Sequence, residues 1–188
     1  MLFLTRFCFL PLLFYYNISV KRNREYIPYL RNLVGHKEIR ATGVTALIIN
    51  EKEEVLLEKR SDNSLFSLPG GALDRDETIY EGRLREIKEE TGLIVKNGIL
   101  FQIISPNHNK VTYPNGDITD YTNFIFLFKV LSKDCPLNKE HDKESLFLKF
   151  YPIDGLPKEE EFLLGSYDPI RKYKRKDFSL TLDERKAQ

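Results

Sequence analysis

The chain has 188 residues, which favours a single domain, because domains usually contain about 100 to 200 residues. Apolar residues make up 41% of the chain and the formal net charge is +1, which excludes global disorder and disfavours a protein dedicated to binding nucleic-acid backbones. The two cysteines and three histidines are too few and too scattered for a disulfide framework or a zinc site, so a bound metal would need oxygen ligands.

Residues 1–19 are mostly Leu, Phe and Tyr and carry one charge, at Arg6. The uncharged run after Arg6 is shorter than the about 20 residues of a membrane-spanning helix, and its basic flank follows it, unlike that of a secretory signal. Three interpretations stay open: a reading frame extended upstream of the native start, a membrane-proximal anchor, and a packed N-terminal element. We favour the first, with the start at Val20 if its codon is GTG, and expect a cytoplasmic protein.

Apolar and alternating runs bounded by turn residues predict five strands. They cover residues 40–50, 55–60, 93–105, 121–131 and 145–151. The first two form a predicted hairpin in the core sheet, and the fourth is apolar enough to be buried on both faces. A polar loop is predicted at 106–117, where Pro114–Asp117 (PNGD) is a strong turn signal.

Helical spacing predicts three helices. They cover residues 25–34, 78–91 and 158–164. Residues 66–73 (FSLPGGAL) contain one Pro and two Gly, which break regular structure and allow close approach of the backbone to another group. A polar, charged tail begins at Arg171. This order indicates one α/β (α+β) domain with a mixed β-sheet over residues 20–188 and a core at about 37–165.

The long helix carries three carboxylates on one face. Relative to Glu86, Glu90 lies about 40° and Glu89 about 60° around the helix axis. Like charges one turn apart cost a few tenths of a kcal/mol, which a divalent cation would reverse. Arg85 lies one turn before Glu89 and can pair with it. Gly82 costs up to about 1 kcal/mol inside a helix and therefore predicts close approach of the preceding loop or a ligand.

A second face of the same helix is predicted to be the core stripe. Its members are Tyr80, Leu84, Ile87 and Thr91. Arg83 lies beside the acidic face. We expect it to contact solvent, with a substrate phosphate as the alternative.

The segment Gly71–Leu93 reads GALDRDETIYEGRLREIKEETGL and is preceded by FSLPG. It carries nine residues at fixed spacing, which are Gly71, Glu77, Arg85, Glu86, Ile87, Glu89, Glu90, Gly92 and Leu93. This pattern resembles the Nudix box at every fixed position, and the sequence is identified as a member of the Nudix hydrolase family. The resemblance implies a Nudix-type α/β/α sandwich. Phe66 departs from many relatives, which have Trp before the LPGG sequence.

The resemblance also implies metal-dependent hydrolysis of the pyrophosphate bond of a nucleoside diphosphate linked to another group, by attack of water at phosphorus. The implied cofactor is Mg²⁺ or Mn²⁺, and Mg²⁺ prefers oxygen ligands. The implied metal ligands are Glu86, Glu89, Glu90 and the Gly70 carbonyl. The implied catalytic residues are Glu89, Glu90 and Arg85. Glu89 is a ligand or the base that activates water, Glu77 braces the loop against the helix, and Glu144 is a candidate base outside the box.

The box does not identify the group attached to the pyrophosphate, which loops must select. Arg60, Phe66 and Tyr113 are the expected substrate-binding residues. In the loop 106–117, His108 is an alternative stacking residue. The amide and carboxylate side chains of this loop could donate or accept hydrogen bonds. An ADP-ribose-like sugar nucleotide and a nucleoside triphosphate both stay open, and we lean toward the sugar nucleotide.

An alternative function from a different class is a non-hydrolytic nucleotide-sensing module that regulates a partner, against which the intact Arg85 and glutamate set argues. The expected partner of the chain is a small-molecule nucleotide, without nucleic acid or membrane. Homodimers are common in the family, and the sequence leaves a monomer and a homodimer open.

Overall fold

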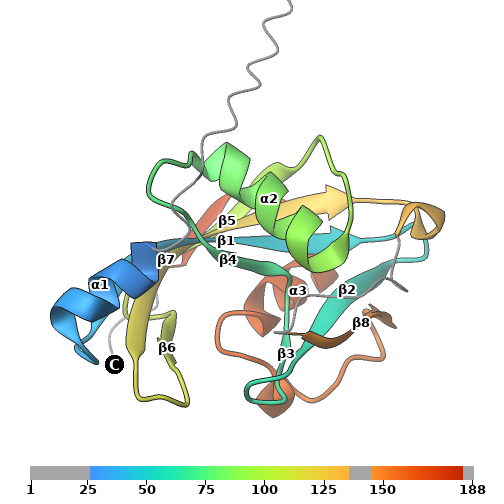
Figure 1. The fold of residues 1–188 in the computed structure, drawn as a ribbon. Coiled ribbons are helices and arrows are strands. Elements are labelled where there is room, and N and C mark those ends of the chain that lie inside the picture. Colours follow the sequence, from blue (N-terminus) through green and yellow to red (C-terminus); the bar gives the residue numbers. More distant parts are fainter. Residues whose placement is uncertain (1–25, 136–144, 184–188) are drawn as a thin grey trace, which may run out of the picture.

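The computed structural model describes residues 26–135 and 145–183. The apolar segment 1–19, the expected start at Val20 and Glu144 lie outside these ranges. Within them, nine strands form one mixed sheet, with three α-helices around it (Figure 1). No helix in these ranges is long and apolar enough to span a lipid bilayer.

The strands are β1 (Ile39–Ile49), β2 (Glu54–Arg60), β3 (Phe66–Ser67), β4 (Gly70–Ala72), β5 (Ile99–Ile104), β6 (Lys110–Thr112), β7 (Ile118–Lys129), β8 (Ser145–Pro152) and β9 (Thr181–Asp183). The α-helices are α1 (Tyr26–Val34), α2 (Ile79–Thr91) and α3 (Tyr167–Lys174). Two short 3₁₀ helices are η1 (Ser132–Asp134) and η2 (Glu159–Glu161).

The centre of the sheet is the long pair β1 and β7, which run parallel from the Ile39–Thr119 pair to the Ile49–Lys129 pair. The main path of the sheet is β3-β2-β1-β7-β5-β9, and β4, β6 and β8 attach to β1, β7 and β2. The β1–β2 and β5–β7 pairs are antiparallel. Parallel and antiparallel pairs occur together, which confirms the predicted mixed sheet and the predicted β1–β2 hairpin.

Successive residues of β1 point to opposite faces of the sheet. Ile48 packs in a core cluster with Ile87 of α2, whereas Leu47 packs in another cluster with Ile170 and Tyr173 of α3. The two helices therefore cover opposite faces of the sheet, and the predicted α/β/α sandwich is confirmed.

The helix α2 begins and ends at specific capping residues. The Thr78 hydroxyl accepts a hydrogen bond from the Glu81 N–H, and the Glu81 side chain accepts one from the Thr78 N–H, which forms a capping box. Gly92 ends the helix in the left-handed conformation, as predicted. A Cβ at Gly82 would lie 2.1 Å from the Leu73 side chain, so the preceding loop approaches this glycine as predicted.

Three predicted segments differ from the structure. Residues 66–73 are not entirely irregular, because β4 pairs antiparallel with β1 through the backbone of its two glycines. The strand predicted from residue 93 begins at Ile99, and the loop 106–117 contains β6, which forms a hairpin with β7. β4 is stabilised by β1, a partner well before it in the chain, and a local pattern does not reveal such pairing.

The prediction that an irregular charged tail begins at Arg171 is wrong, because residues 167–174 form α3. Ile170 and Tyr173 lie three residues apart on one side of α3, and both are buried. β9 follows and pairs parallel with β5. The core thus extends past residue 165, where the sequence pattern placed its end, and the predicted helix at 158–164 is reduced to η2.

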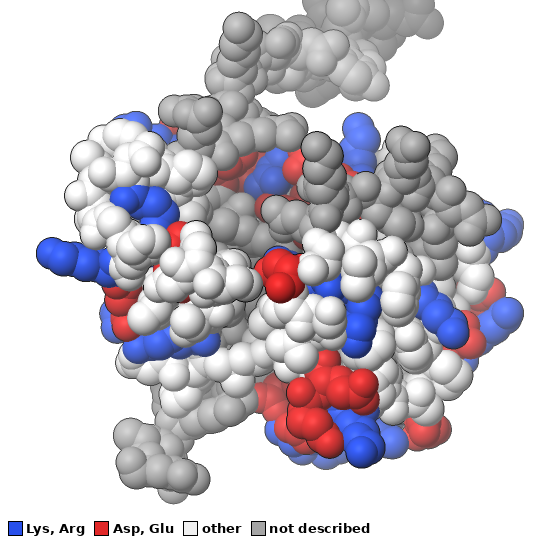
Figure 2. Space-filling view, turned by 60° about the horizontal axis from the view of Figure 1, so that its bottom comes forward, with Lys and Arg blue, Asp and Glu red and all other residues white. Residues whose placement is uncertain are grey.

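The surface of the described residues is mixed in charge. On the face shown in Figure 2, lysine and arginine side chains lie among aspartate, glutamate and uncharged residues. This arrangement matches the formal net charge of +1, and no broad basic surface covers this face of the described residues.

Candidate active site

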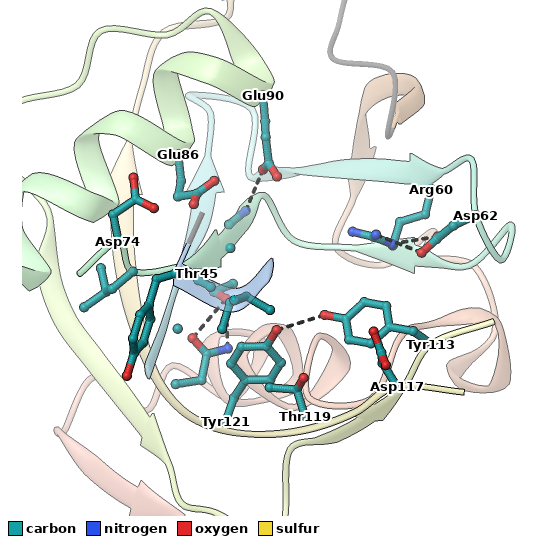
Figure 3. A pocket seen from close by; sticks show the side chains of 18 of the residues that line it. Thr45, Arg60, Asp62, Asp74, Glu86, Glu90, Tyr113, Asp117, Thr119 and Tyr121 are labelled. Atoms are coloured by element: carbon teal, nitrogen blue, oxygen red, sulfur yellow. Dashed lines mark hydrogen bonds and ion pairs between the residues drawn. The ribbon is translucent and has the colours of Figure 1, made fainter. Parts of the chain in front are cut away.

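A cavity of about 780 Å³ lies beside the acidic face of α2 (Figure 3). We call it the main cavity. Its walls come from α2, from β4 and the residues after it, from the β6–β7 hairpin and from α1. Figure 3 shows Glu86 and Glu90 on one side of the main cavity and Tyr113, Thr119 and Tyr121 on the other.

Glu90 lies in the last turn of α2 and lines the main cavity. Its residue is only 9% exposed, and its Oε2 accepts a hydrogen bond of 2.6 Å from the Gly70 N–H. Burial raises the pKa of Glu90 well above its usual range, and the charges of Glu58 and Glu86 raise it further. Gly70 has a φ of +150°, and a Cβ there would lie 2.2 Å from the Val44 carbonyl oxygen, so only glycine fits this close approach.

Glu86 lies one turn before Glu90, against the backbone of Gly71. A Cβ at Gly71 would lie 2.7 Å from the Glu86 Oε1. Burial raises the pKa of Glu86 to about 7, although the neighbouring Arg85 guanidinium lowers it. Both carboxylates therefore lie where their charged forms are disfavoured unless a cation is close.

Arg85 connects the acidic residues of α2 to the loop before it. Its guanidinium donates to the Glu77 Oε1 at 2.8 Å and Oε2 at 2.7 Å, to the Glu86 Oε1 at 2.8 Å and to the Glu89 Oε2 at 3.1 Å. These contacts, that to Glu77 first, raise the pKa of Arg85. Glu77 also accepts a hydrogen bond from the Asp74 N–H, so it braces the loop against the helix as predicted.

All four expected metal ligands line the main cavity, which are Gly70, Glu86, Glu89 and Glu90. The Glu89 side chain is 32% exposed and accepts a hydrogen bond from Arg85. Among the described residues, no three His, Cys, Asp or Glu side chains gather into a complete metal site. The available donors are carboxylate and carbonyl oxygens, which suit a hard cation that keeps several bound waters.

Two of the expected substrate-binding residues line the main cavity. Arg60 forms two hydrogen bonds of 2.9 Å to the Asp62 carboxylate. The Tyr113 hydroxyl lies 2.9 Å from the Tyr121 hydroxyl, and burial together with this neighbour raises the pKa of Tyr121. His108 is not among the lining residues, although other residues of its loop are.

The structure places Phe66 in the hydrophobic core, where it is 7% exposed and packs against Tyr151 and Phe162. It does not line the main cavity. Phe66 is the first residue of the buried run 66–69, and burial of its apolar ring accounts for its place in the core. Glu144, the expected outside base, lies outside the described residues.

Arg83 and Tyr80 contradict their expected positions on α2. Arg83 is 6% exposed, stacks over the rings of Phe126 and Tyr80 and donates to the Gly98 carbonyl at 3.1 Å. Tyr80, expected in the core, is 57% exposed. The expectation that Arg83 contacts solvent is wrong, because aromatic rings cover its guanidinium and the Gly98 carbonyl accepts one of its hydrogen bonds.

Sequence reasoning missed Glu58, whose residue is 1% exposed in β2. It accepts hydrogen bonds from the hydroxyls of Ser67, at 2.9 Å, and Ser145. Among charged neighbours, Glu58 has the largest effect on the pKa of Glu90, which it raises. A single acidic residue inside the buried run VLLEKR was the available signal. The α1 residues that line the main cavity, among them Tyr26 and Arg31, had no comparable signal.

Comparisons with known proteins agree with this geometry. A model of the protein family described as NUDIX domain matches residues 39–173. The ADP-ribose pyrophosphatase of Methanocaldococcus jannaschii is 32% identical over 157 residues, which cover 81% of this chain and 86% of that protein. The 8-oxo-dGDP phosphatase of Mus musculus is 31% identical over 61% of this chain, but the match spans only 33% of that protein's length.

Solved structures resemble this fold. The crystal structure of an ADP-ribose pyrophosphatase from Streptococcus suis is 23% identical, with 76% of this chain and 98% of that chain covered and a TM-score of 0.56. At this identity the likeness concerns the fold alone.

Proposed function

The chain belongs to the Nudix hydrolase family, and we propose that it hydrolyses the pyrophosphate bond of a nucleoside diphosphate linked to another group, with an ADP-ribose-like sugar nucleotide as substrate. The observation that carries this proposal is the meeting of Glu86, Glu90 and the Gly70 backbone in one cavity, beside Arg85. A pyrophosphate is strongly anionic, so an acidic cavity can accept it only together with cations.

A divalent cation, Mg²⁺ or Mn²⁺, fits the donors of this cavity. Glu86 and Glu90 would hold it with the Gly70 carbonyl, and waters would complete its coordination. Burial opposes the charged forms of both carboxylates, and a nearby positive charge would reverse that effect. When bound, such a cation lowers the pKa of a coordinated water and neutralises charge on the leaving phosphate.

The reaction needs a proton acceptor and fixed carboxylates. A water molecule forms a bond to one phosphorus, the bridging P–O bond breaks, and the proton of the water passes to a carboxylate base. Glu89 is our candidate base, because its side chain is the most exposed of the three and Arg85 holds it at 3.1 Å. Arg85 is proposed to orient Glu86 and Glu89 rather than to bind the phosphate.

The charges of the main cavity favour a diphosphate over a triphosphate. Its basic lining residues are Arg31, Arg60 and Arg85, and each already lies within 3.4 Å of a carboxylate oxygen of the chain. An added phosphate would therefore find no uncommitted basic side chain among the described lining residues. The tyrosine, asparagine and threonine side chains of the opposite wall can donate to or accept from sugar hydroxyls.

The comparisons support the same choice. The M. jannaschii relative, an ADP-ribose pyrophosphatase, is matched over 86% of its length, whereas the mouse 8-oxo-dGDP phosphatase is matched over 33%. The longer match includes more of the loops that select a substrate.

The test is incubation of the purified protein with Mg²⁺ or Mn²⁺ and a panel of ADP-ribose, other sugar nucleotides, ordinary nucleoside triphosphates and 8-oxo-guanine nucleotides, followed by chromatography. We expect AMP and ribose 5-phosphate from ADP-ribose, and no product when a chelator removes the metal. Faster cleavage of a triphosphate would reject the sugar-nucleotide assignment. Binding of a nucleotide without cleavage of any would favour the non-hydrolytic regulatory module.

A further inference from the structure

The helix α1 lies outside the family-matched segment 39–173, yet it forms part of the wall of the main cavity. Tyr26, Ile27, Pro28 and Arg31 all line this cavity. The other lining residues lie between Gly43 and Asn123, inside the matched segment, so the family match alone does not account for the shape of the cavity.

Arg31 holds α1 in place. Its guanidinium donates to the Lys37 and Ile118 carbonyls at 2.7 Å each and to the Thr119 hydroxyl at 2.8 Å, and its Nε lies 3.4 Å from the Asp117 carboxylate. The helix itself has no buried residue. With so little apolar burial, these polar contacts are the main attachment of α1 to the β6–β7 hairpin.

The contacts of Arg31 also place α1 relative to the reacting groups. In Figure 3, Asp117 and Thr119 lie across the main cavity from Glu86 and Glu90. Arg31 binds that same far side, so α1 is held across the main cavity from the two carboxylates. Tyr26 is half-buried there and offers an aromatic surface.

We propose that α1 is a specificity element, in which Tyr26 contacts the group beyond the pyrophosphate and Arg31 is a positioning residue that keeps α1 over the cavity. This inference rests on the proposed function and names the part of the chain that selects its substrate. Contacts remote from the reacting bond that are equally strong in the ground state and the transition state change KM and leave kcat unaltered.

The test compares Tyr26→Ala with Tyr29→Ala. Tyr29 lies on the same helix, is 50% exposed and does not line the main cavity, so its variant is a matched control. For ADP-ribose we expect Tyr26→Ala to raise KM roughly tenfold with kcat within about twofold of wild type. The dissociation constant of a non-hydrolysable methylene-bridged analogue of ADP-ribose, measured by calorimetry, should rise by the same factor.

Arg31→Ala tests the positioning role. We expect a similar rise in KM, and the double variant Arg31→Ala/Tyr26→Ala should be no worse than the more affected single variant, because both act through α1. If the wild-type protein cleaves ADP-ribose, and the Tyr26 and Tyr29 variants have the same KM and the same affinity for the analogue, this inference is overturned while the proposed function stands. A wild-type protein that neither binds nor cleaves any pyrophosphate substrate would reject the proposed function, and this inference with it.

Discussion

The side chain of Glu90 is buried among other acidic groups, and this position opposes its charge. Burial raises its pKa well above the usual range, Glu58 and Glu86 add to that effect, and the Gly70 N–H is the neutral group that opposes it. A buried carboxylate with one neutral hydrogen-bond donor costs stability. This burial at the cavity is why we propose a chemical role for Glu90.

Glu90→Gln is therefore expected to lower turnover of ADP-ribose by at least about 100-fold, because the amide cannot hold a cation as a carboxylate does. The melting temperature should stay equal or rise, since the variant removes a buried charge and keeps an oxygen for the Gly70 N–H. Steady-state kinetics and thermal unfolding check both expectations. The control is Glu160→Gln, a surface carboxylate of η2 that does not line the main cavity. Near wild-type turnover by Glu90→Gln would reject the role of Glu90.

Gly70→Ala tests the backbone contact that supports Glu90. The new Cβ would lie 2.2 Å from the Val44 carbonyl oxygen and 2.7 Å from the Thr45 Cα, and backbone atoms cannot rotate aside. We expect a loss of about 2 to 4 kcal/mol in the free energy of unfolding, measured by urea denaturation, and a fall in turnover as the Gly70 N–H moves from Glu90. Gly155→Ala is the control, because a Cβ there meets only Pro152 atoms at 3.7 Å or more.

At the scale of elements, α2 is attached to the sheet partly through a buried cation. The Arg83 guanidinium lies 4.5 Å from the Tyr80 ring centroid and 4.7 Å from that of Phe126, and it donates to the Gly98 carbonyl. Arg83 thus joins α2 to β7 and to the segment before β5. It does not line the main cavity, which separates its contribution to stability from the chemistry.

Arg83→Ala should lower the free energy of unfolding by about 2 to 3 kcal/mol, because it leaves a void beneath aromatic rings and an unpaired Gly98 carbonyl. Turnover per folded molecule should remain within about twofold of wild type. Urea denaturation and kinetics below the transition distinguish the two effects. Lys88→Ala, an exposed position of the same helix, should change the free energy of unfolding by less than about 0.5 kcal/mol. A large loss of turnover in Arg83→Ala would place it in the substrate site instead.

The elements that local chemistry controls were predictable. α2 was predicted within one residue, because Gly92 in the left-handed conformation and the apolar spacing of the helix act within the segment itself. β9 was not predicted, since its three residues are strand only through pairing with β5, nearly eighty positions earlier. The burial of Arg83 was not predicted for the same reason, because two of the three rings near its guanidinium, those of Phe126 and Phe128, come from β7.

At the scale of the whole molecule, the same distinction applies to the site. The spacing of Glu86 and Glu90 on one helix face was readable from the sequence, because helix geometry fixes it. The contributions of Glu58 and of α1 were not readable, since β2 and α1 reach the main cavity only through the folding of the sheet. Cavity residues that come from separate elements are therefore less predictable than residues that share one helix face.

Glu53, in the turn between β1 and β2, joins this turn to α3. The Glu53 carboxylate lies 2.8 Å from the Lys129 Nζ and 3.2 Å from the Lys176 Nζ, and it accepts a hydrogen bond of 2.7 Å from the Tyr173 hydroxyl. These contacts, led by that of Lys129, lower the pKa of Glu53 from 4.5 to about 2. Its charge therefore stabilises the folded state above the unfolded pKa, and this stabilisation is lost as the pH falls toward 2.

Glu53→Gln should accordingly be less stable than wild type near pH 7 and indistinguishable from it near pH 2. We expect a difference of only about 0.5 to 1 kcal/mol at pH 7, because the side chain of Glu53 is 51% exposed and solvent screens its ion pairs. Urea denaturation at pH 7, 5, 4 and 3 measures the difference, which should shrink from pH 5 downward and also shrink in 1 M salt at pH 7. Gln has the same side-chain length as Glu and the same Cβ at this position, where φ is +59°. A difference that stays constant with pH and salt would show that Glu53 acts through the shape of the turn rather than through its charge.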